Sequence, residues 1–211
     1  EIHRASRQMS ELLDPLRGHA SGVDVPVDAD LTEIVRNAAS LTALGAPHKL
    51  SVEKDLPDHP IQALVDPVRL TQVLLNLGLN ARDAIGLEEG TIRFAMSRAT
   101  SVPDDMMLNV GQIPDAPFAH LVVSDTGPGI PEDIRQKVWD AYFTTKGAQG
   151  TGLGLALVAQ IINDVGGGIA LDTSSGRGTT LHILWPLNQA EVVTEVAAGT
   201  KPAGRNRALQ H

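Results

Sequence analysis

The sequence contains no cysteine, and this absence excludes several kinds of chemistry at once. Disulfide frameworks, thiolate zinc sites and cysteine nucleophiles all require the thiol, so any metal must be held by oxygen or imidazole ligands. Aromatic residues are also scarce, since the 211 residues include two Trp, one Tyr and three Phe. With 42% hydrophobic residues the chain can still build the core of one medium domain.

Two further absences concern partners and membranes. Lys and Arg total 17 against 25 Asp and Glu, a formal net charge of −8, and no basic run offsets the acidic excess. The charge pattern that binds a phosphate backbone is therefore missing, and no nucleic-acid partner is expected. No apolar stretch is long enough to span a bilayer, and the polar start at Glu1 lacks a signal-peptide pattern. We expect a cytoplasmic location, which includes the cytoplasmic part of a membrane-bound parent.

The order of apolar patterns predicts an α+β domain with flanking segments. Residues 1–17 have helical spacing of apolar side chains, and the Gly-, Asp- and Pro-rich stretch 18–30 predicts a linker. The domain is expected over 31–187, followed by a flexible tail, or a linker to a downstream domain, over 188–211. No regular βαβ alternation is present, which argues against a doubly wound nucleotide fold. The predicted helices are 31–44, 67–85, 131–138 and 154–165, and the predicted strands are 49–55, 61–65, 91–97, 118–124, 169–173 and 179–185, with a surface excursion over 99–117.

The predicted helix 67–85 is apolar nearly all round and carries one polar stripe. Its residues are spaced by three or four and so share one helix face: Arg69, Gln72, Asn76, Asn80 and Asp83. A solvated face is the simpler explanation, but such faces are usually built from Lys and Glu, whereas Asn disfavours helices and has a coordinating amide oxygen. We interpret the stripe as a site for a hard cation such as Mg²⁺, which keeps water and phosphate oxygens in its other positions.

Two glycine-rich segments are candidates for ligand binding. In Ser124-Asp125-Thr126-Gly127-Pro128-Gly129-Ile130 a carboxylate follows a strand and can accept from an exocyclic amine, although Asp-x-Gly-x-Gly is also an ordinary turn. Gly150-Thr151-Gly152-Leu153-Gly154-Leu155 leads into a helix, where bare N–H groups favour phosphate; the alternative is a flexible connection. Neither the Walker pattern nor Gly-x-Gly-x-x-Gly occurs, so phosphates would bind in another glycine architecture.

Two shorter segments complete the pattern. Residues 139–146 (WDAYFTTK) hold three of the six aromatic side chains, and core packing is the expected role of Trp139 and Phe143. Lys146, beside the glycine segment, is predicted to face phosphate. Gly176-Arg177-Gly178-Thr179 is, taken alone, a hairpin turn.

The order of these motifs resembles the GHKL ATPase superfamily, and within it the catalytic domain of sensor histidine kinases. The resemblance covers residues 31–186, and the stretches NLGLNARDAI, DTGPGIP, YFTTK and GTGLGLALV look like the nitrogen-regulation and oxygen-sensing type. It implies a Bergerat-type fold, a two-layer α/β sandwich in which helices cover one face of a mixed sheet. ATP would lie between the long helix and a lid that is very short over 146–149.

The resemblance also implies roles for individual residues. Asn80 would be the principal Mg²⁺ ligand with Asn76 in support as the catalytic pair, and Asp125 would bind the adenine amine with Thr179 nearby. The other ATP-binding positions would be Asp83, Gly127, Gly129, Ile130, Lys146, Gly150, Thr151, Gly152, Leu153, Gly154 and Leu155. Two positions depart from the family pattern. Ala141 replaces a frequent Pro, and Asp83 replaces a frequent Lys, so a phosphate-binding lysine cannot be transferred to position 83.

Asn76 separates the subfamilies on chemical grounds. Gyrase-type ATPases, mismatch-repair ATPases and the serine kinases of the superfamily carry Glu at this position, four residues before the metal-binding Asn, where it acts as a general base. An amide cannot do so, whereas a neutral imidazole is already a nucleophile. We therefore expect a protein-histidine kinase that uses ATP and Mg²⁺ to transfer the γ-phosphoryl group to histidine.

In the family the acceptor histidine lies on a helical hairpin before the ATP domain, and none of the seven histidines here, His3 included, has that context. Residues 1–17 look like the C-terminal end of the dimerisation hairpin, so the chain alone is expected to be inactive. The expected partners are the histidine-bearing hairpin of the parent kinase, a response regulator or receiver domain, and a second copy in a homodimeric parent. Two alternatives stay open. A non-catalytic pseudokinase or phosphotransfer scaffold is disfavoured by the intact motifs, and a gyrase-like ATPase by the missing Glu.

Overall fold

The structure is a computed structural model, and it describes residues 26–115, 117–147 and 150–187. The predicted helix over 1–17, most of the predicted linker and the predicted tail over 188–211 lie outside these residues. Within the described part of the chain, no helix combines the length and apolar character needed to cross a bilayer.

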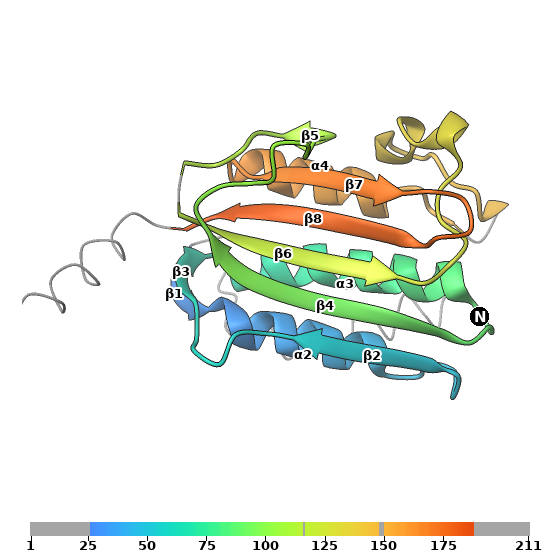
Figure 1. Cartoon of the computed structure of the whole chain (residues 1–211), viewed down its shortest axis with the longest axis horizontal. Helices are drawn as coiled ribbons and strands as arrows, with labels where there is room; N and C mark the ends of the chain where they lie inside the picture. The colour runs from blue at the N-terminus through green and yellow to red at the C-terminus, as the bar shows by residue number, and fades with distance from the viewer. Residues whose placement is uncertain (1–25, 116, 148–149, 188–211) are drawn as a thin grey trace, which may run out of the picture.

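Six strands form a mixed sheet with helices on one face, as predicted. Strands β2 and β4 run parallel, and every other neighbouring pair in the sheet is antiparallel. Figure 1 looks onto the open face of the sheet, with the helices α2 (Leu31–Ala43), α3 (Pro67–Ile85) and α4 (Gly154–Asp164) behind it. The strand order is β2 (Leu50–Asp55), β4 (Gly90–Ala99), β6 (Phe118–Asp125), β8 (Thr179–Pro186), β7 (Gly168–Thr173) and β5 (Val110–Gly111).

Helix α3 is the central helix of the covering layer. Asp66 caps its start, because Oδ1 accepts hydrogen bonds from the backbone N–H groups of Val68 (2.9 Å) and Arg69 (3.2 Å), and Pro67 occupies the first helical position. The helix packs between α2 and α4 and against the sheet, so it is buried nearly all round. The core that it shares with the sheet includes Leu70, Leu74, Leu77, Ile92, Phe94, Leu121 and Ile183.

Helices α2 and α3 approach closely at Gly78. A β-carbon at this position would lie 2.4 Å from Thr42 Oγ1 and 2.8 Å from Phe94 Cζ. Both neighbours are fully buried, so neither can move away easily. The missing side chain of Gly78 therefore sets the spacing of the helices over the sheet.

The linker prediction is wrong for its last four residues. Val27–Asp30 form strand β1, which pairs antiparallel with β3 (Gln62–Val65), with Val27 opposite Val65. Its partner lies more than thirty residues away, so local composition does not reveal the pairing. Asp30 ends this strand and caps α2 by accepting from the Thr32 N–H at 2.8 Å.

Two other predictions need correction. The helix expected over 131–138 consists instead of two short 3₁₀ turns, Glu132–Ile134 (η1) and Lys137–Trp139 (η2), neither of which has a side-chain cap. A segment this short cannot recover the cost of nucleating an α-helix. The excursion 99–117 contains the short strand β5, which extends the sheet beside β7.

Candidate functional site

The predicted site residues gather where β6 ends and α4 begins. Asp125 is the last residue of β6 and lies opposite Thr179, the first residue of β8. The C-terminal half of α3 and the N-terminus of α4 lie behind the sheet in Figure 1. The site is therefore built from the ends of four regular elements, which fix its shape.

Asn76 and Asn80 lie side by side, facing the start of α4. A β-carbon on Gly154 would lie 3.6 Å from Asn76 Oδ1 and 3.6 Å from Asn80 Nδ2. The backbone at the start of α4 therefore lies within van der Waals reach of both amides. The helical spacing predicted this shared face, and two amide oxygens beside bare helix N–H groups suit a cation bound to phosphate.

The polar stripe of α3 divides into two parts. Its C-terminal part, with Asn76, Asn80 and Asp83, faces the site. Arg69, at the other end of the helix, instead bridges to α4, with its Nη1 3.2 Å from Asp164 Oδ2. For Arg69 the structure favours a helix-to-helix contact over the predicted membership of a site.

Asp125 is a half-buried carboxylate with partly satisfied oxygens. Its Oδ1 accepts a hydrogen bond from the Gly127 N–H at 2.8 Å. Burial raises the pKa of Asp125 above its ordinary value of 3.8, and hydrogen bonds from the backbone N–H groups of Gly127 and Thr179 partly oppose this rise. A carboxylate at a strand end with remaining acceptor capacity can bind an amine-bearing ring, and this role of Asp125 stays a prediction.

The loop after Asp125 is fixed to the β7–β8 turn. Gly129 has a φ of 72°, and a β-carbon there would lie 2.1 Å from the Ser174 carbonyl oxygen. The Ile130 N–H donates to Thr173 Oγ1 at 2.9 Å, and that hydroxyl donates to the Gly178 carbonyl at 2.9 Å. Gly129 thus packs on the Ser174 carbonyl, and Ile130 holds the loop through Thr173, a residue that carries no motif and that the sequence reasoning missed.

The aromatic segment and the second glycine segment lie against each other. The Tyr142 N–H donates to the Gly152 carbonyl at 2.9 Å. Gly152 has a φ of 64°, and a β-carbon on it would lie 2.4 Å from the Tyr142 carbonyl carbon. In the described part of the chain, Tyr142 is the single non-glycine residue with positive φ (70°), and it is 77% exposed. Such a conformation costs roughly 1–2 kcal/mol, so the contact with Gly152 holds the segment in an unfavourable form.

Lys146 and Asp83, both predicted ATP-binding residues, form an ion pair. The Lys146 Nζ atom lies 2.7 Å from Asp83 Oδ2. Asp83 follows Asn80 by three residues on α3, so the pair adjoins the two asparagines. The remaining predicted positions, Thr151, Leu153 and Leu155, lie where the glycine segment enters α4, with Thr151 Oγ1 accepting from the Leu153 N–H at 3.4 Å.

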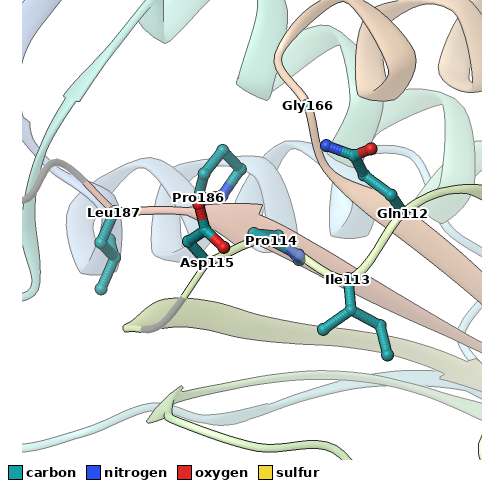
Figure 2. Close-up of a pocket in the computed structure, with 7 residues that line it drawn as sticks. All are labelled: Gln112, Ile113, Pro114, Asp115, Gly166, Pro186 and Leu187. Carbon is teal, nitrogen blue, oxygen red and sulfur yellow. The ribbon is translucent and has the colours of Figure 1, made fainter.

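A hollow of about 320 Å³ lies elsewhere on the molecule. Figure 2 shows its lining, which comes from the segment after β5, the loop after α4 and the end of β8. Because β8 starts at Thr179 in the site and ends at Pro186 beside the hollow, the two places are at opposite ends of the sheet. None of the predicted site residues lines this hollow. Its lining residues are Gln112, Ile113, Pro114, Asp115, Gly166, Pro186 and Leu187.

Comparison with protein families assigns the chain to a known family. The family described as "Histidine kinase-, DNA gyrase B-, and HSP90-like ATPase" (HATPase_c) matches residues 65–189. The chain belongs to this family. The matched range includes every predicted site residue, from Asn76 to Thr179, so the HATPase_c resemblance in the sequence is confirmed.

Individual relatives of this HATPase_c chain are sensor kinases. The sensor kinase CckA of Brucella abortus is 36% identical over 164 residues, which are 76% of this chain and 17% of the relative. The sensor histidine kinase ZraS of Escherichia coli K12 is 34% identical over 193 residues, 89% of this chain and 36% of the relative. The sensory histidine kinase/phosphatase NtrB of Rhizobium leguminosarum bv. phaseoli is 37% identical over 142 residues, which are 66% of this chain and 35% of the relative. The chain thus spans about a third or less of each relative's length.

Solved structures place the HATPase_c fold among kinase domains. The mycobacterial sensor histidine kinase MprB superposes with a TM-score of 0.60 at 26% identity, covering 78% of this chain and 99% of that one. The catalytic domain of the histidine kinase ThkA gives a TM-score of 0.60 at 28% identity, covering 77% of this chain and 95% of that one. The predicted α+β kinase-domain fold is therefore confirmed.

Proposed function

We propose that this chain is the ATP-binding catalytic domain of a two-component sensor histidine kinase, which transfers the γ-phosphoryl group of ATP to a histidine on a helical hairpin. The observation that carries the proposal is the placement of Asn76 and Asn80 against Gly154 at the start of α4. The loop after Asp125 packs on the same helix, since a β-carbon on Gly127 would lie 3.4 Å from Ala84 Cβ. This arrangement offers separate positions for a cation, a phosphate chain and an amine-bearing base. Membership of the HATPase_c family supports the same reading.

The residues present fit a bound magnesium ion. Amide oxygens are hard ligands, and Asn80, supported by Asn76, would hold Mg²⁺ together with phosphate oxygens of ATP. When bound, the ion would neutralise charge that develops on the transferring phosphoryl group. The backbone N–H groups at the start of α4 would hold phosphate, and Asp125 would accept from the adenine amine and so orient the base.

The identity of Asn76 favours histidine as the acceptor. Neither Asn76 nor Asn80 can remove a proton from water or a hydroxyl group, because a neutral amide is not a base at physiological pH. A neutral imidazole attacks without prior deprotonation. The site therefore supports positioning and charge stabilisation, which phosphoryl transfer to histidine requires.

Several finer points belong to the same proposal. The parent would be a homodimeric kinase of the nitrogen-regulation and oxygen-sensing type, in which residues 1–17 end the dimerisation hairpin and residues 188–211 are a tail or a linker. A response regulator or receiver domain would receive the phosphoryl group. The domain would work in the cytoplasm. The motifs NLGLNARDAI and YFTTK and the NtrB relative support the assignment of type.

Calorimetric titration with a non-hydrolysable ATP analogue, with and without Mg²⁺, tests the proposal. We expect saturable binding that Mg²⁺ strengthens. In Asn80→Ala the gain in affinity that Mg²⁺ gives the ATP analogue should fall about tenfold or more, the scale of a lost contact to a charged group. The helical circular dichroism signal should not change. Gln72→Ala changes a residue of the same polar stripe two turns earlier and is the matched control: because the site faces only Asn76, Asn80 and Asp83, this variant should bind as the wild type does.

The second stage supplies the histidine-bearing hairpin of a relative in trans and detects acid-labile phosphohistidine. Nucleotide binding followed by phosphohistidine would establish the kinase. Binding without phosphotransfer to any hairpin, but with steady ATP hydrolysis, would favour a gyrase-like ATPase instead. Absence of binding at millimolar nucleotide would indicate a pseudokinase scaffold and refute the proposal.

A further inference from the structure

Three side chains form one row across the ends of three neighbouring strands. Asp125 of β6 lies directly opposite Thr179 of β8, and Thr179 lies directly opposite Thr173 of β7. Side chains at opposed positions of an antiparallel pair point to the same face of the sheet. Here that face is the helix-covered one, because Thr179 alternates with the core residues Leu181 and Ile183. The row therefore lies on the side of the sheet where the site is built.

The Thr173 hydroxyl is fully committed within this row. The residue is 7% exposed, and its oxygen accepts a hydrogen bond from the Ile130 N–H at 2.9 Å. Its one hydrogen goes to the Gly178 carbonyl, also at 2.9 Å, because a carbonyl can only accept. The remaining lone pair of Thr173 serves the contact with the Thr179 hydroxyl at 3.3 Å. Since a hydroxyl group has one hydrogen and two lone pairs, Thr173 has no hydrogen left for Thr179.

The direction of the contact between the two threonines follows by exclusion. Because Thr173 donates to Gly178, Thr179 must be the donor across the 3.3 Å contact. A hydroxyl that donates its hydrogen in this way keeps its two lone pairs and has no hydrogen to offer a ligand. The neighbouring Asp125 carboxylate is also an acceptor. The row thus presents acceptors to the site, and both of its hydroxyl hydrogens are used within the protein.

Two neighbouring acceptors match the two hydrogens of one exocyclic amine. Opposed residues of an antiparallel pair have β-carbons about 4.5–5.5 Å apart. Two acceptors that each take one hydrogen of the same amine, at N···O distances of about 2.9 Å, stand roughly 5 Å apart. Asp125 and Thr179, which are opposed on β6 and β8, therefore suit such an amine. A carbonyl group in the same place would face two acceptors and no donor.

We propose that Thr173 is a positioning residue that holds the Thr179 hydroxyl as an acceptor, so that Asp125 and Thr179 together select a base with an exocyclic amine. The inference rests on the proposed ATP-binding function and adds a residue that determines its specificity. It also gives the β7–β8 turn a part in choosing the ligand. The same turn is tied to the loop after Asp125, because the Gly176 N–H donates to the Pro128 carbonyl at 2.6 Å.

The test compares the non-hydrolysable ATP analogue with its purine riboside counterpart, which has hydrogen in place of the amine and is otherwise the same. The ratio of the two affinities, measured by calorimetry, isolates the amine. We expect the wild type to prefer the amine-bearing analogue about tenfold or more, the scale of two hydrogen bonds. In Thr173→Val the Thr179 hydroxyl can turn, so the ratio should fall about threefold or more. Thr173→Ser keeps the hydroxyl and should restore the wild-type ratio.

A double variant shows whether Thr173 acts through Thr179. Thr179→Val removes one acceptor and should lower the ratio about threefold to tenfold. Adding Thr173→Val to Thr179→Val should then lower the ratio no further, whereas independent, multiplying losses would overturn the proposal. Thr179→Val leaves the bonds of Thr173 to Ile130 and Gly178 in place. An unchanged ratio in Thr179→Val therefore refutes the proposal even if Thr173→Val does not fold.

Thr32→Val is the matched control for the loss of a buried threonine hydroxyl. Thr32 is 2% exposed, and its Oγ1 accepts from the Ile61 N–H at 3.1 Å, beside β3 at the other end of the sheet from Asp125 (Figure 1). This variant should lose stability in urea unfolding, as Thr173→Val does, and keep the wild-type ratio. Equal affinity losses for both analogues in Thr173→Val would show a structural role only, refute the inference and leave the proposed function standing. Failure of the wild type to bind either analogue would instead remove the proposed function itself.

Discussion

At the scale of single residues, Asp125 shows how a functional group can oppose stability. Burial raises its pKa above 3.8, so the folded chain holds the ionised carboxylate less well than the unfolded chain does. Below pH 3.8 both states are protonated and the penalty is absent. As the pH rises through 3.8 towards the raised folded pKa, stability is lost, and it stays lost at neutral pH.

Asp125→Asn should therefore separate binding from stability. We expect affinity for the ATP analogue to fall about tenfold or more, because the amide presents a donor where the base requires an acceptor. The free energy of unfolding at pH 7 should be unchanged or larger, since the partly buried charge is gone. Calorimetry and urea unfolding measure the two quantities.

Asp172→Asn removes an exposed carboxylate on β7, which β8 separates from the strand of Asp125; this variant is the matched control and should leave affinity unchanged. Equal ATP affinity in Asp125→Asn and the wild type would contradict the role given to Asp125.

The residues of the site differ in how far sequence could predict them. Asn76, Asn80 and Asp125 belong to short motifs whose spacing fixes a shared face or a strand end, and their positions follow from helix and strand geometry. The contact of Lys146 with Asp83 joins segments 63 residues apart, so no local pattern contains it. The hydroxyl of Thr173 connects two loops, and Arg69 forms an ion pair with Asp164 of another helix. Neither contact follows from the local sequence.

At the scale of elements, α3 positions the site by its distance from α2. Gly78 lies on the face towards Thr42 and Phe94, two residues before Asn80. Any side chain at 78 would push α3 away from α2 or from the sheet. The packing of the core and the geometry of the site thus depend on the same turn of helix.

Gly78→Ala should destabilise the protein even though alanine is the better helix former. The helix propensity gain is about 1 kcal/mol, whereas overpacking a closed core costs about 1–3 kcal/mol. We expect a net loss of stability, measured by thermal and urea unfolding. Thr42→Ala in the same chain removes the closest atom and should recover part of the loss.

Additive losses in the Gly78→Ala, Thr42→Ala double variant would show that the contact is not the cause.

Long periodic elements were predictable and short ones were not. The apolar pattern of α3 located the helix to within a residue, and the antiparallel strands β6, β7 and β8 followed from their apolar runs. Strand β1 was not predicted because its four residues pair only with the distant strand β3. An α-helix was wrongly predicted at the 3₁₀ turns η1 and η2 because apolar spacing alone cannot distinguish single helical turns from a short α-helix.

At the scale of the whole molecule, the two faces of the sheet differ in chemistry. The helix-covered face is apolar, and the open face carries His120 of β6 and His182 of β8, with Nε2 and Nδ1 3.0 Å apart and ring centroids at 5.2 Å. Burial lowers the pKa of both histidines below 6.5. The charge of His182 lowers the pKa of His120 further, whereas Asp172 raises that of His182.

These lowered pKa values predict a loss of stability in mild acid. Above pH 6.5 both rings are neutral in the folded and unfolded chains. As the pH falls from 6.5 towards the lowered folded pKa values, the unfolded chain takes up protons first and the free energy of unfolding decreases. Urea unfolding at a series of pH values measures this slope.

His120→Gln with His182→Gln should flatten the slope between pH 7.5 and 5.5, with Asp125 unchanged in both proteins. An identical slope in the double variant would assign the acid sensitivity to other groups.

The left-handed conformation of Tyr142 has a practical consequence for spectroscopy. It is the only tyrosine in the chain, and the residue is 77% exposed while its backbone N–H donates to the Gly152 carbonyl. Biosynthetic 3-fluorotyrosine would therefore give a single ¹⁹F resonance from the very segment that carries Lys146. Its chemical shift and line width would report, in the unmutated sequence and on the millisecond scale, whether that segment rearranges as nucleotide is added.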